Sequence, residues 1–387
     1  MCGIAGIVDL NSLPQINFPI LKSMSDVIIH RGPDAEGQWI SDDYRCGLAF
    51  RRLSIIDLSS AGNQPMATAD GHFTIVFNGE VYNHISIRNE LESRGYKYHS
   101  KTDTETILNG YKEFGADILQ QLLGMWGLAI WDDEKKELFA ARDRIGIKPF
   151  YYTYQNGRFI FGSEIKSILQ HPSFSPELNL EELPNYLNYG MSGRESLFKN
   201  IKKLPPGHYL QLRKNGDLKI ERYWSPLKED MPYTELSESE IHSEVLKMLK
   251  QSIKDRMMSD VPFGVFLSGG IDSSLNVALM AELMNRPVDT FTVGFKELEK
   301  YNELEYARKI ANIYKTNHHE ILIDHDDVFP ILENMIWHED EPNADPVCMP
   351  LYFLSKLTRD SGTIVIQVGE GSDEQFCGYK WMLREYN

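Results

Sequence analysis

The distribution of apolar residues changes once along the chain. Up to about residue 170, short apolar runs predict strands at 2–9, 73–77, 127–131 and 150–154, the second of them ending at the turn dipeptide Asn78 and Gly79. Helices are predicted over 84–94, just before the common helix-ending residue Gly95, and from about Asp103 onward. Short strands interspersed with helices indicate an α+β domain.

From about residue 237, longer helices alternate with short apolar strands. Helices are predicted over 237–258 and 303–313, and strands over 265–267, 290–295 and 363–368. This rhythm predicts a parallel α/β sheet. Prolines punctuate the stretch before it, where one small strand is predicted at 208–212. We therefore predict a first domain at 2–170, a connecting region at 171–236 and a second domain at 237–387.

Composition narrows the function classes. The chain has 387 residues and a formal net charge of -16, so we do not expect nucleic acid as a partner, because an acidic surface repels phosphate. It has no apolar run long enough to span a membrane, and its first residues lack the basic stretch and cleavage site of a signal peptide. The four cysteines are scattered, which predicts neither a disulfide framework nor a zinc site. We expect a cytoplasmic protein.

Cys2 is a candidate nucleophile because of its position. It directly follows Met1, whose removal would leave the thiol beside a free α-amine. An α-amine has a pKa of about 7.7 to 8.0 and can accept the thiol proton near neutral pH. Taken alone, however, this cysteine is better explained as a small buried hydrophobic residue.

Other segments contain the remaining groups that hydrolysis of a glutamine side chain requires. Such a site needs donors for the oxyanion, a carboxylate for the substrate ammonium and a cation for the substrate carboxylate. Asn78 and the Gly79 amide can supply the donors, Glu80 or Asp103 the carboxylate, and Arg52 a two-pronged cation. Simpler explanations exist as well, since Asn-Gly is a common turn and Asp103 can cap a helix.

Taken together, the motifs of the first half resemble the class II glutaminase domain, an N-terminal-nucleophile hydrolase with an αββα sandwich fold. The matching segments are MCGIAGI at 1–7, HRGPD at 30–34, RLSIID at 52–57, NGEVYNH at 78–84, DTE at 103–105, GMWGLAIWD at 124–132, ARDRIGIKPFYY at 141–152 and SEIKSI at 163–168. The resemblance implies Cys2 as nucleophile and Asn78 with Gly79 as oxyanion hole. It implies these glutamine contacts: Arg52, Ile55, Asn78, Glu80 and Asp103.

The segment SGGIDSS at 268–274 follows a predicted strand and opens a helix. Glycines let the backbone approach a phosphate, and a helix N-terminus offers free N–H groups and a positive dipole. Asp272 would repel phosphate, so a role in holding Mg²⁺ fits it better. The segment is not a Walker loop, and a lone Ser-Gly-Gly is better explained as a glycine-rich turn with a serine cap.

In full, this segment resembles the pyrophosphate loop of ATP pyrophosphatases, which have a parallel-sheet α/β fold. The resemblance implies Mg²⁺ at Asp272 and Asp373. It implies these ATP contacts: Leu267, Ser268, Gly269, Gly270, Asp272, Ser273, Ser274, Val293, Gly369 and Glu370. The segment HEDEPNADP at 338–346 resembles the acidic loop of the same family and is equally typical of a solvated charged loop.

A glutaminase followed by such an ATP domain resembles the glutamine-dependent asparagine synthetase family over nearly the whole chain. The resemblance implies that ammonia from glutamine passes through a tunnel to an aspartyl-adenylate made from aspartate and ATP. Two residues depart from the family, Val368 in place of a small hydroxyl residue and Cys377 in place of glycine. Family members also continue past this motif with a helical stretch that carries basic residues. We therefore expect the second domain to be incomplete at its C-terminal end.

Two alternatives stay open at this point. A related amidotransferase that acts on a sugar acid or a peptide would share both sets of motifs. A nucleotide-binding paralogue without the second reaction would keep the fold. The substrates expected are glutamine, ATP and aspartate or another carboxylate, with ATP and Mg²⁺ as cofactors, and a homodimer is left open.

Overall fold

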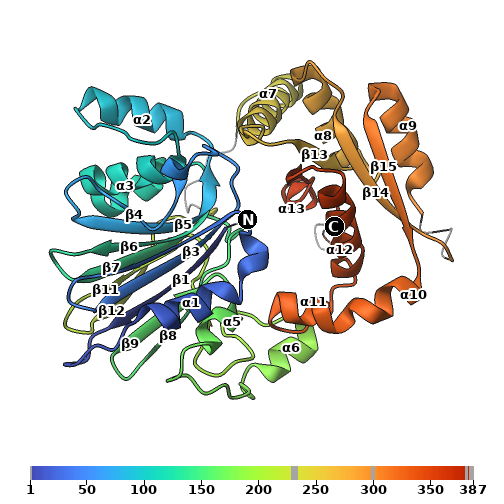
Figure 1. Ribbon diagram of the computed structural model, residues 1–387. Coiled ribbons are helices and arrows are strands. Elements are labelled where there is room, and N and C mark those ends of the chain that lie inside the picture. Colours follow the sequence, from blue (N-terminus) through green and yellow to red (C-terminus); the bar gives the residue numbers. More distant parts are fainter. Residues whose placement is uncertain (1, 228–233, 298–299, 301, 380–381, 383–387) are drawn as a thin grey trace. The chain divides into compact units, whose positions relative to one another are not determined.

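The computed structural model describes residues 2–227, 234–297, 300, 302–379 and 382 (Figure 1). Its internal contacts divide the chain into two compact units. The first comprises Met1–Tyr233 together with Trp337–Ala344, and the second comprises Thr234–Ile336 and Asp345–Asn387. The expected connecting region falls largely in the first unit, and residues 228–233 of it lie outside the described residues. The domain limits given above stay predictions.

The first unit is built on two six-stranded sheets whose strand pairs are antiparallel. One sheet has the order β10 (Lys202–Lys203), β8 (Tyr151–Gln155), β9 (Arg158–Gly162), β1 (Gly3–Asp9), β3 (Cys46–Arg52), β2 (Ala35–Ile40). The other has the order β12 (Leu218–Arg222), β11 (His208–Leu212), β7 (Glu137–Arg142), β6 (Gly124–Asp132), β5 (Phe73–Val81), β4 (Met66–Ala67). The predicted strands at 127–131, 150–154 and 208–212 correspond to β6, β8 and β11.

The apolar side chains of these sheets form three layers of core. The layer between the sheets includes Ile4 and Val8 of β1 against Val76 of β5 and Trp131 of β6. The outer faces are covered by helices, which are α1 (Phe18–Asp26) and α5 (Ile165–Leu169) on one sheet and α2 (His84–Ser93) and α3 (Asp103–Phe114) on the other. Shorter helices are α4 (Ile118–Gln121) and α6 (Leu183–Tyr189). The expected αββα sandwich is confirmed.

Strand β5 differs from the prediction in one place that matters for the site. Asn78 and Gly79 do not form a turn, because β5 continues through them to Val81 and pairs with β6 along its whole length. A Cβ on Gly79 would lie 2.2 Å from the Met125 carbonyl oxygen, so only glycine lets the two strands approach this closely here. Pairing with β6 therefore outweighs the local turn preference of Asn-Gly.

The second unit contains a parallel four-stranded sheet, as expected. Its order is β15 (Asn317–Ile323), β14 (Asp289–Phe295), β13 (Phe263–Phe266), β16 (Val365–Gln367). Its helices are α7 (Glu238–Arg256), α8 (Ile271–Leu283), α9 (Leu304–Tyr314), α10 (His325–Val328), α12 (Cys348–Asp360) and α13 (Ser372–Phe376), while α11 (Leu332–Glu339) crosses from this unit into the first. The core joins Val265 and Leu267 to Val277 and Met280 of α8 and Ala307 of α9.

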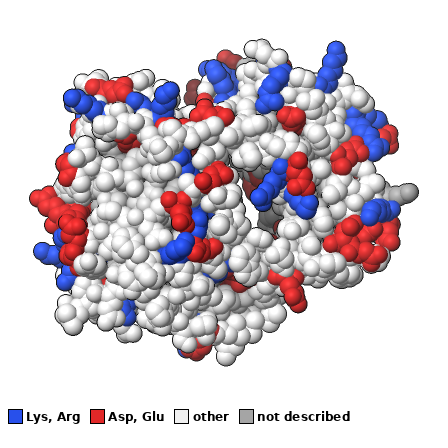
Figure 2. Space-filling view, viewed as in Figure 1, with Lys and Arg blue, Asp and Glu red and all other residues white. Residues whose placement is uncertain are grey.

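On the face drawn in Figure 2, acidic and basic side chains are interspersed. Within the described part of the chain, none of the helices combines the length and the apolar character that crossing a bilayer would require.

Candidate active sites

Cys2 lies just outside the first strand ladder, whose first registered pair is Gly3 with Arg51. Its carbonyl oxygen instead accepts a hydrogen bond from Nε of Arg31 at 3.0 Å. The Leu53 N–H donates to the thiol sulfur at 3.5 Å. Burial raises the pKa of the Cys2 thiol, so the resting sulfur is protonated at neutral pH and needs a base before it can attack.

Asn78 carries the clearest sign of a ligand pocket in the first unit. Its side chain is buried, and neither its Nδ2 nor its Oδ1 atom has a hydrogen-bond partner among the described residues. Leaving a buried polar atom unsatisfied costs about 1 to 3 kcal/mol, and most buried amides in proteins avoid this. An amide held in this state on a strand is suited to bind a polar ligand that completes its hydrogen bonds.

Asp103 is the first residue of α3 and does not cap the helix. The cap is Thr102, whose side chain accepts a hydrogen bond from the Glu105 N–H. The Asp103 carboxylate accepts the Val81 N–H at 2.9 Å, and its charge acts on the Cys2 thiol. Burial raises the pKa of Asp103 to about 6. A positively charged group placed beside this carboxylate would favour its ionised form.

Arg52 organises the loop that contains Ile55. Its Nη1 donates to the Ser59 carbonyl at 2.6 Å and to Asn63 Oδ1 at 2.8 Å, and its Nη2 donates to the Asp57 carbonyl. Most of its donors therefore already have protein partners, and Nε is the one left for a ligand carboxylate among the described contacts. Gly62 packs against both Arg52 and Thr102, which places the guanidinium near the start of α3.

Lys148 belongs to the same neighbourhood and was given no role from the sequence, although it lies in the motif ARDRIGIKPFYY. It is buried, and burial lowers its pKa to about 8, with the Arg31 charge adding to the effect. The charges of Glu80 and Cys2 oppose this lowering. The structure thus gathers Cys2, Glu80 and Asp103, as the sequence predicted, and adds Arg31 and Lys148.

In the second unit, the loop between β13 and α8 has the shape of a phosphate cradle. Gly269 has φ +86, and a Cβ there would lie 2.5 Å from the Tyr306 side chain. Gly270 is the residue before α8, so the free N–H groups of the first helical turn follow it. Ser268 and Ser273 hydrogen-bond to each other at 3.0 Å, and Oγ of Ser274 is buried without a partner among the described residues.

A cavity of about 270 Å³ opens beside this loop, at the carboxyl ends of the parallel strands. It is lined by these predicted ATP or metal residues: Leu267, Ser268, Asp272, Ser273, Val293, Gly369, Glu370 and Asp373. Gly269, Gly270 and Ser274 do not line it. Val368, which departs from the family pattern, and the carboxylate residue Glu374 line it as well. No role was predicted from the sequence for these further lining residues: Phe266, Phe291, Thr292, Glu303, Leu351, Leu354, Gly371 and Tyr379.

The carboxylates of Asp272 and Asp373 in this cavity are a donor set that would fit Mg²⁺. Burial raises the pKa of Asp272, and the nearby Asp373 charge raises it further, so the two carboxylates repel each other. A divalent cation between them would relieve that repulsion. In the described part of the chain, no group of three or more His, Cys, Asp or Glu side chains is arranged to hold a metal. Mg²⁺ is commonly held by one or two carboxylates plus phosphate oxygens and water, which matches this donor set.

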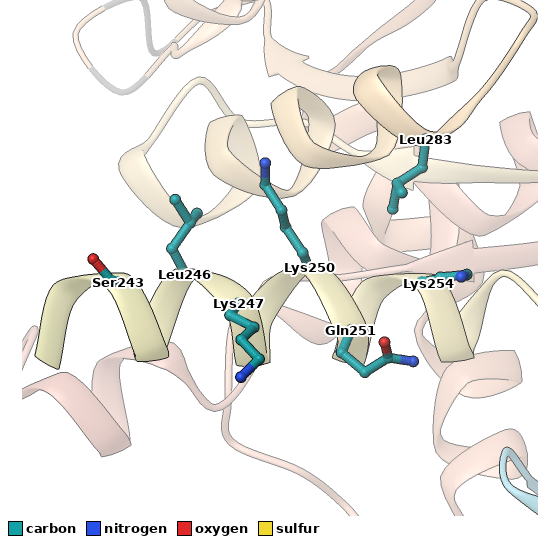
Figure 3. Close-up of a pocket in the computed structure, with 7 residues that line it drawn as sticks. All are labelled: Ser243, Leu246, Lys247, Lys250, Gln251, Lys254 and Leu283. Atoms are coloured by element: carbon teal, nitrogen blue, oxygen red, sulfur yellow. The ribbon is translucent and has the colours of Figure 1, made fainter. Parts of the chain in front are cut away.

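A second hollow, of about 420 Å³, lies between α7 and α8 (Figure 3). It is lined by Ser243, Leu246, Lys247, Lys250, Gln251, Lys254 and Leu283. Lys250 is paired with Glu282 at 2.8 Å and Lys247 with Glu244 at 3.4 Å. The hollow has neither a glycine-rich loop nor a carboxylate pair in its lining, so the cavity beside Ser268 is the better candidate for nucleotide.

Comparison with known proteins matches the two halves of the chain to two different family models. A family model described as "Glutamine amidotransferase domain" matches residues 1–224, and one described as "Asparagine synthase" matches residues 244–387. Asparagine synthetase [glutamine-hydrolyzing] 1 of Bacillus subtilis is 36% identical over 98% of this chain and 59% of its own length. Asparagine synthetase [glutamine-hydrolyzing] 3 of the same organism is 34% identical over 98% of this chain and 64% of its own length.

A relative with another name also matches. Amidase chry2 of Gibberella zeae is 32% identical over 98% of this chain and 59% of its own length. The chain thus spans about three fifths of the length of these relatives. Putative asparagine synthetase [glutamine-hydrolyzing] 2 of Methanocaldococcus jannaschii is 34% identical over 100% of this chain and 77% of its own length. With the two family models, these matches show that the chain belongs to the glutamine-hydrolysing asparagine synthetase family.

Proposed function

We propose that the first unit hydrolyses glutamine with Cys2 as nucleophile. After removal of Met1, the α-amine of Cys2 takes the thiol proton, and the sulfur attacks the amide carbon of the substrate. Asn78 and the Gly79 amide stabilise the oxyanion, while Glu80 and Asp103 hold the substrate ammonium. Arg52 and the loop at Ile55 hold the substrate carboxylate. Collapse of the tetrahedral intermediate breaks the C–N bond, so that ammonia leaves with the proton held by the α-amine and a thioester remains on Cys2. Water then hydrolyses the thioester, which releases glutamate and restores the thiol.

The unsatisfied amide of Asn78 is the observation that carries this proposal. It lies on β5, one residue before Gly79 and two before Glu80. The Val81 N–H of the same strand donates a hydrogen bond to the Asp103 carboxylate. A donor held by packing, and not by hydrogen bonds, is available without reorganisation when negative charge develops on the substrate oxygen. This arrangement supports the role of an oxyanion hole.

We propose that the second unit uses ATP to activate a carboxylate. Leu267, Val293 and Gly369 would hold the nucleoside, and Ser268, Gly269, Gly270, Asp272, Ser273 and Ser274 would hold the phosphates, with Glu370 close to the reacting groups. An ionised carboxylate resists attack by an amine, so conversion to an acyl-adenylate supplies AMP as leaving group and releases pyrophosphate. Ammonia then attacks the acyl carbon to form the amide. Mg²⁺ at Asp272 and Asp373 would neutralise phosphate charge.

Aspartate is the acceptor that the relatives favour, since the Bacillus proteins carry the name asparagine synthetase. The products would then be asparagine, glutamate, AMP and pyrophosphate. The relative named amidase favours a second candidate, in which the same chemistry amidates another carboxylate. Rates of pyrophosphate release with a panel of carboxylic acids distinguish the two.

The two-site account is tested with one variant in each unit. In Cys2→Ala, glutamate release from glutamine is expected to fall to background while ATP use with ammonium salts persists, because the nucleophile alone is removed. Cys377→Ser removes an exposed thiol and serves as the control. In Asp272→Ala, pyrophosphate release is expected to stop while glutamine hydrolysis persists. Loss of both activities in either folded variant would contradict the assignment of separate sites.

A further inference from the structure

The segment Trp337–Ala344, here called the docked segment, belongs to the first unit by its contacts although the chain on both sides of it belongs to the second. Its contacts are polar and specific. Asp340 accepts the Ile165 N–H at 2.6 Å, and Glu341 accepts the Leu197 N–H at 2.5 Å and the Ser192 hydroxyl at 2.8 Å. The charged run at 338–346 is therefore not a freely solvated loop over these residues.

Asp340 begins an alternating row of buried charges. Its carboxylate pairs with Nζ of Lys166 at 2.9 Å, and Lys166 also donates to Glu164. Glu164 in turn accepts Nη1 of Arg31 at 2.9 Å, and Arg31 donates through Nε to the Cys2 carbonyl at 3.0 Å. All four charged side chains are less than one tenth exposed. The order is Asp340, Lys166, Glu164, Arg31, with neighbouring charges opposite at every step.

Aromatic and imidazole rings pack beside this row of charged side chains. His30 hydrogen-bonds to Glu164 at 2.9 Å, and its ring lies against those of Trp337 and His338, with centroids 5.2 and 4.7 Å away. Lys166 lies over the Trp337 ring at 4.8 Å. With water excluded, each ion depends on its neighbours, and removal of one partner leaves a buried charge uncompensated. The position of Arg31 is therefore tied to that of Asp340.

We propose that Asp340 is a positioning residue for the glutamine-hydrolysing reaction, acting on Cys2 through Lys166, Glu164 and Arg31. Cys2 lies outside the strand ladder. Its thiol contacts Leu53, and the Arg31 hydrogen bond to its carbonyl restrains its backbone. This inference rests on the proposed role of Cys2. It makes the geometry of the first reaction depend on a segment that is continuous with the ATP-binding unit.

The first test is Asp340→Asn in the full chain, which keeps the shape and removes the charge. We expect kcat for glutamine hydrolysis to fall about tenfold or more, because small displacements of a reacting group are costly, with KM for glutamine nearly unchanged. The rate at which iodoacetamide labels Cys2, followed by mass spectrometry of its peptide, should change in the same variant. This second readout needs no substrate.

Glu341→Gln is the matched control, since Glu341 is a buried carboxylate of the same segment that bonds to Ser192 and Leu197 and is absent from the row. It should leave kcat and Cys2 labelling close to those of the parent chain. An equal loss in Glu341→Gln would show that docking alone matters and would overturn the positioning role. Unchanged kcat and unchanged labelling in Asp340→Asn would overturn it too.

A double-mutant cycle with Glu164→Gln separates a connected row from independent contacts. In a connected row, the variant carrying both Glu164→Gln and Asp340→Asn loses about as much kcat as Glu164→Gln alone. Additive losses would contradict the inference. If the parent chain hydrolyses no glutamine, the proposed function fails by itself. The rates at which iodoacetamide labels Cys2 in Asp340→Asn, Glu164→Gln and the variant carrying both changes still decide the positioning role.

Discussion

At the scale of single residues, burial sets the ionisation of the groups around Cys2. Burial raises the pKa of the Cys2 thiol and that of Asp103, and it lowers the pKa of Lys148 to about 8. These shifts all disfavour the charged form, as expected for a site that excludes water before its substrate arrives. A substrate ammonium would reverse the effect at Asp103 and hold it ionised.

The Asp103 carboxylate predicts an acid limb in the pH profile of glutamine hydrolysis. Its pKa of about 6 in the free protein means that it becomes protonated as the pH falls below that value and then no longer attracts the substrate ammonium. We expect kcat/KM for glutamine to fall about tenfold per pH unit below that point, measured as initial rates of glutamate release. In Asp103→Asn, kcat/KM should be low throughout and this limb should be absent. The same limb persisting in Asp103→Asn would assign it to another group.

The sequence pointed to individual candidate groups and not to the contacts that connect them. Cys2, Glu80 and Asp103 lie in motifs that point to their roles, and the structure brings them into one neighbourhood. The pairing of Lys166 with Asp340 joins residues 174 positions apart, and nothing in the local pattern around either residue specifies it. A buried ion pair of this kind depends on tertiary packing, which apolar periodicity does not reveal.

At the scale of elements, the sequence predicted several of the strands and missed others. β14 is buried on both faces and was recognised, whereas β12, with the sequence LKIER, lies at a sheet edge and was missed. β5 was cut short in the prediction because Asn-Gly favours turns, while pairing with β6 decided its true end. Local preference is thus a weak guide where a second strand supplies the hydrogen bonds.

The loop between β13 and α8 offers a comparison of two adjacent glycines. In Gly269→Ala, the left-handed backbone alone costs about 1 to 2 kcal/mol, and the new methyl group meets Tyr306. We expect a lower thermal midpoint and markedly weaker ATP binding by calorimetry. Gly270→Ala is the comparison within the same loop, because Gly270 has φ -66 and its added methyl group therefore brings no left-handed strain, although its Cβ would lie 3.3 Å from the Ser268 hydroxyl oxygen. Equal ATP affinity in the parent and Gly269→Ala would argue against this loop as the phosphate site.

At the scale of the whole molecule, the chain combines two units of different fold, an antiparallel sandwich and a parallel sheet, each with its own candidate site. The two family models follow the same division. The one exception is the docked segment, which belongs to the first unit by its contacts and is joined to the second by the chain at both ends. The acidic run at 338–346 marks a loop but does not indicate which unit the loop contacts, so the sequence placed the segment with its neighbours.

If the two reactions are coupled, the amide nitrogen of glutamine enters a new amide whose formation consumes ATP. The most direct test is to incubate the chain with amide-¹⁵N-labelled glutamine, ATP and Mg²⁺, with and without aspartate, and to follow pyrophosphate and asparagine. The account predicts aspartate-dependent pyrophosphate release and ¹⁵N in the side-chain amide of asparagine. Glutamate release without any aspartate-dependent pyrophosphate would contradict aspartate as the acceptor, and the absence of glutamate release would contradict the glutaminase site itself.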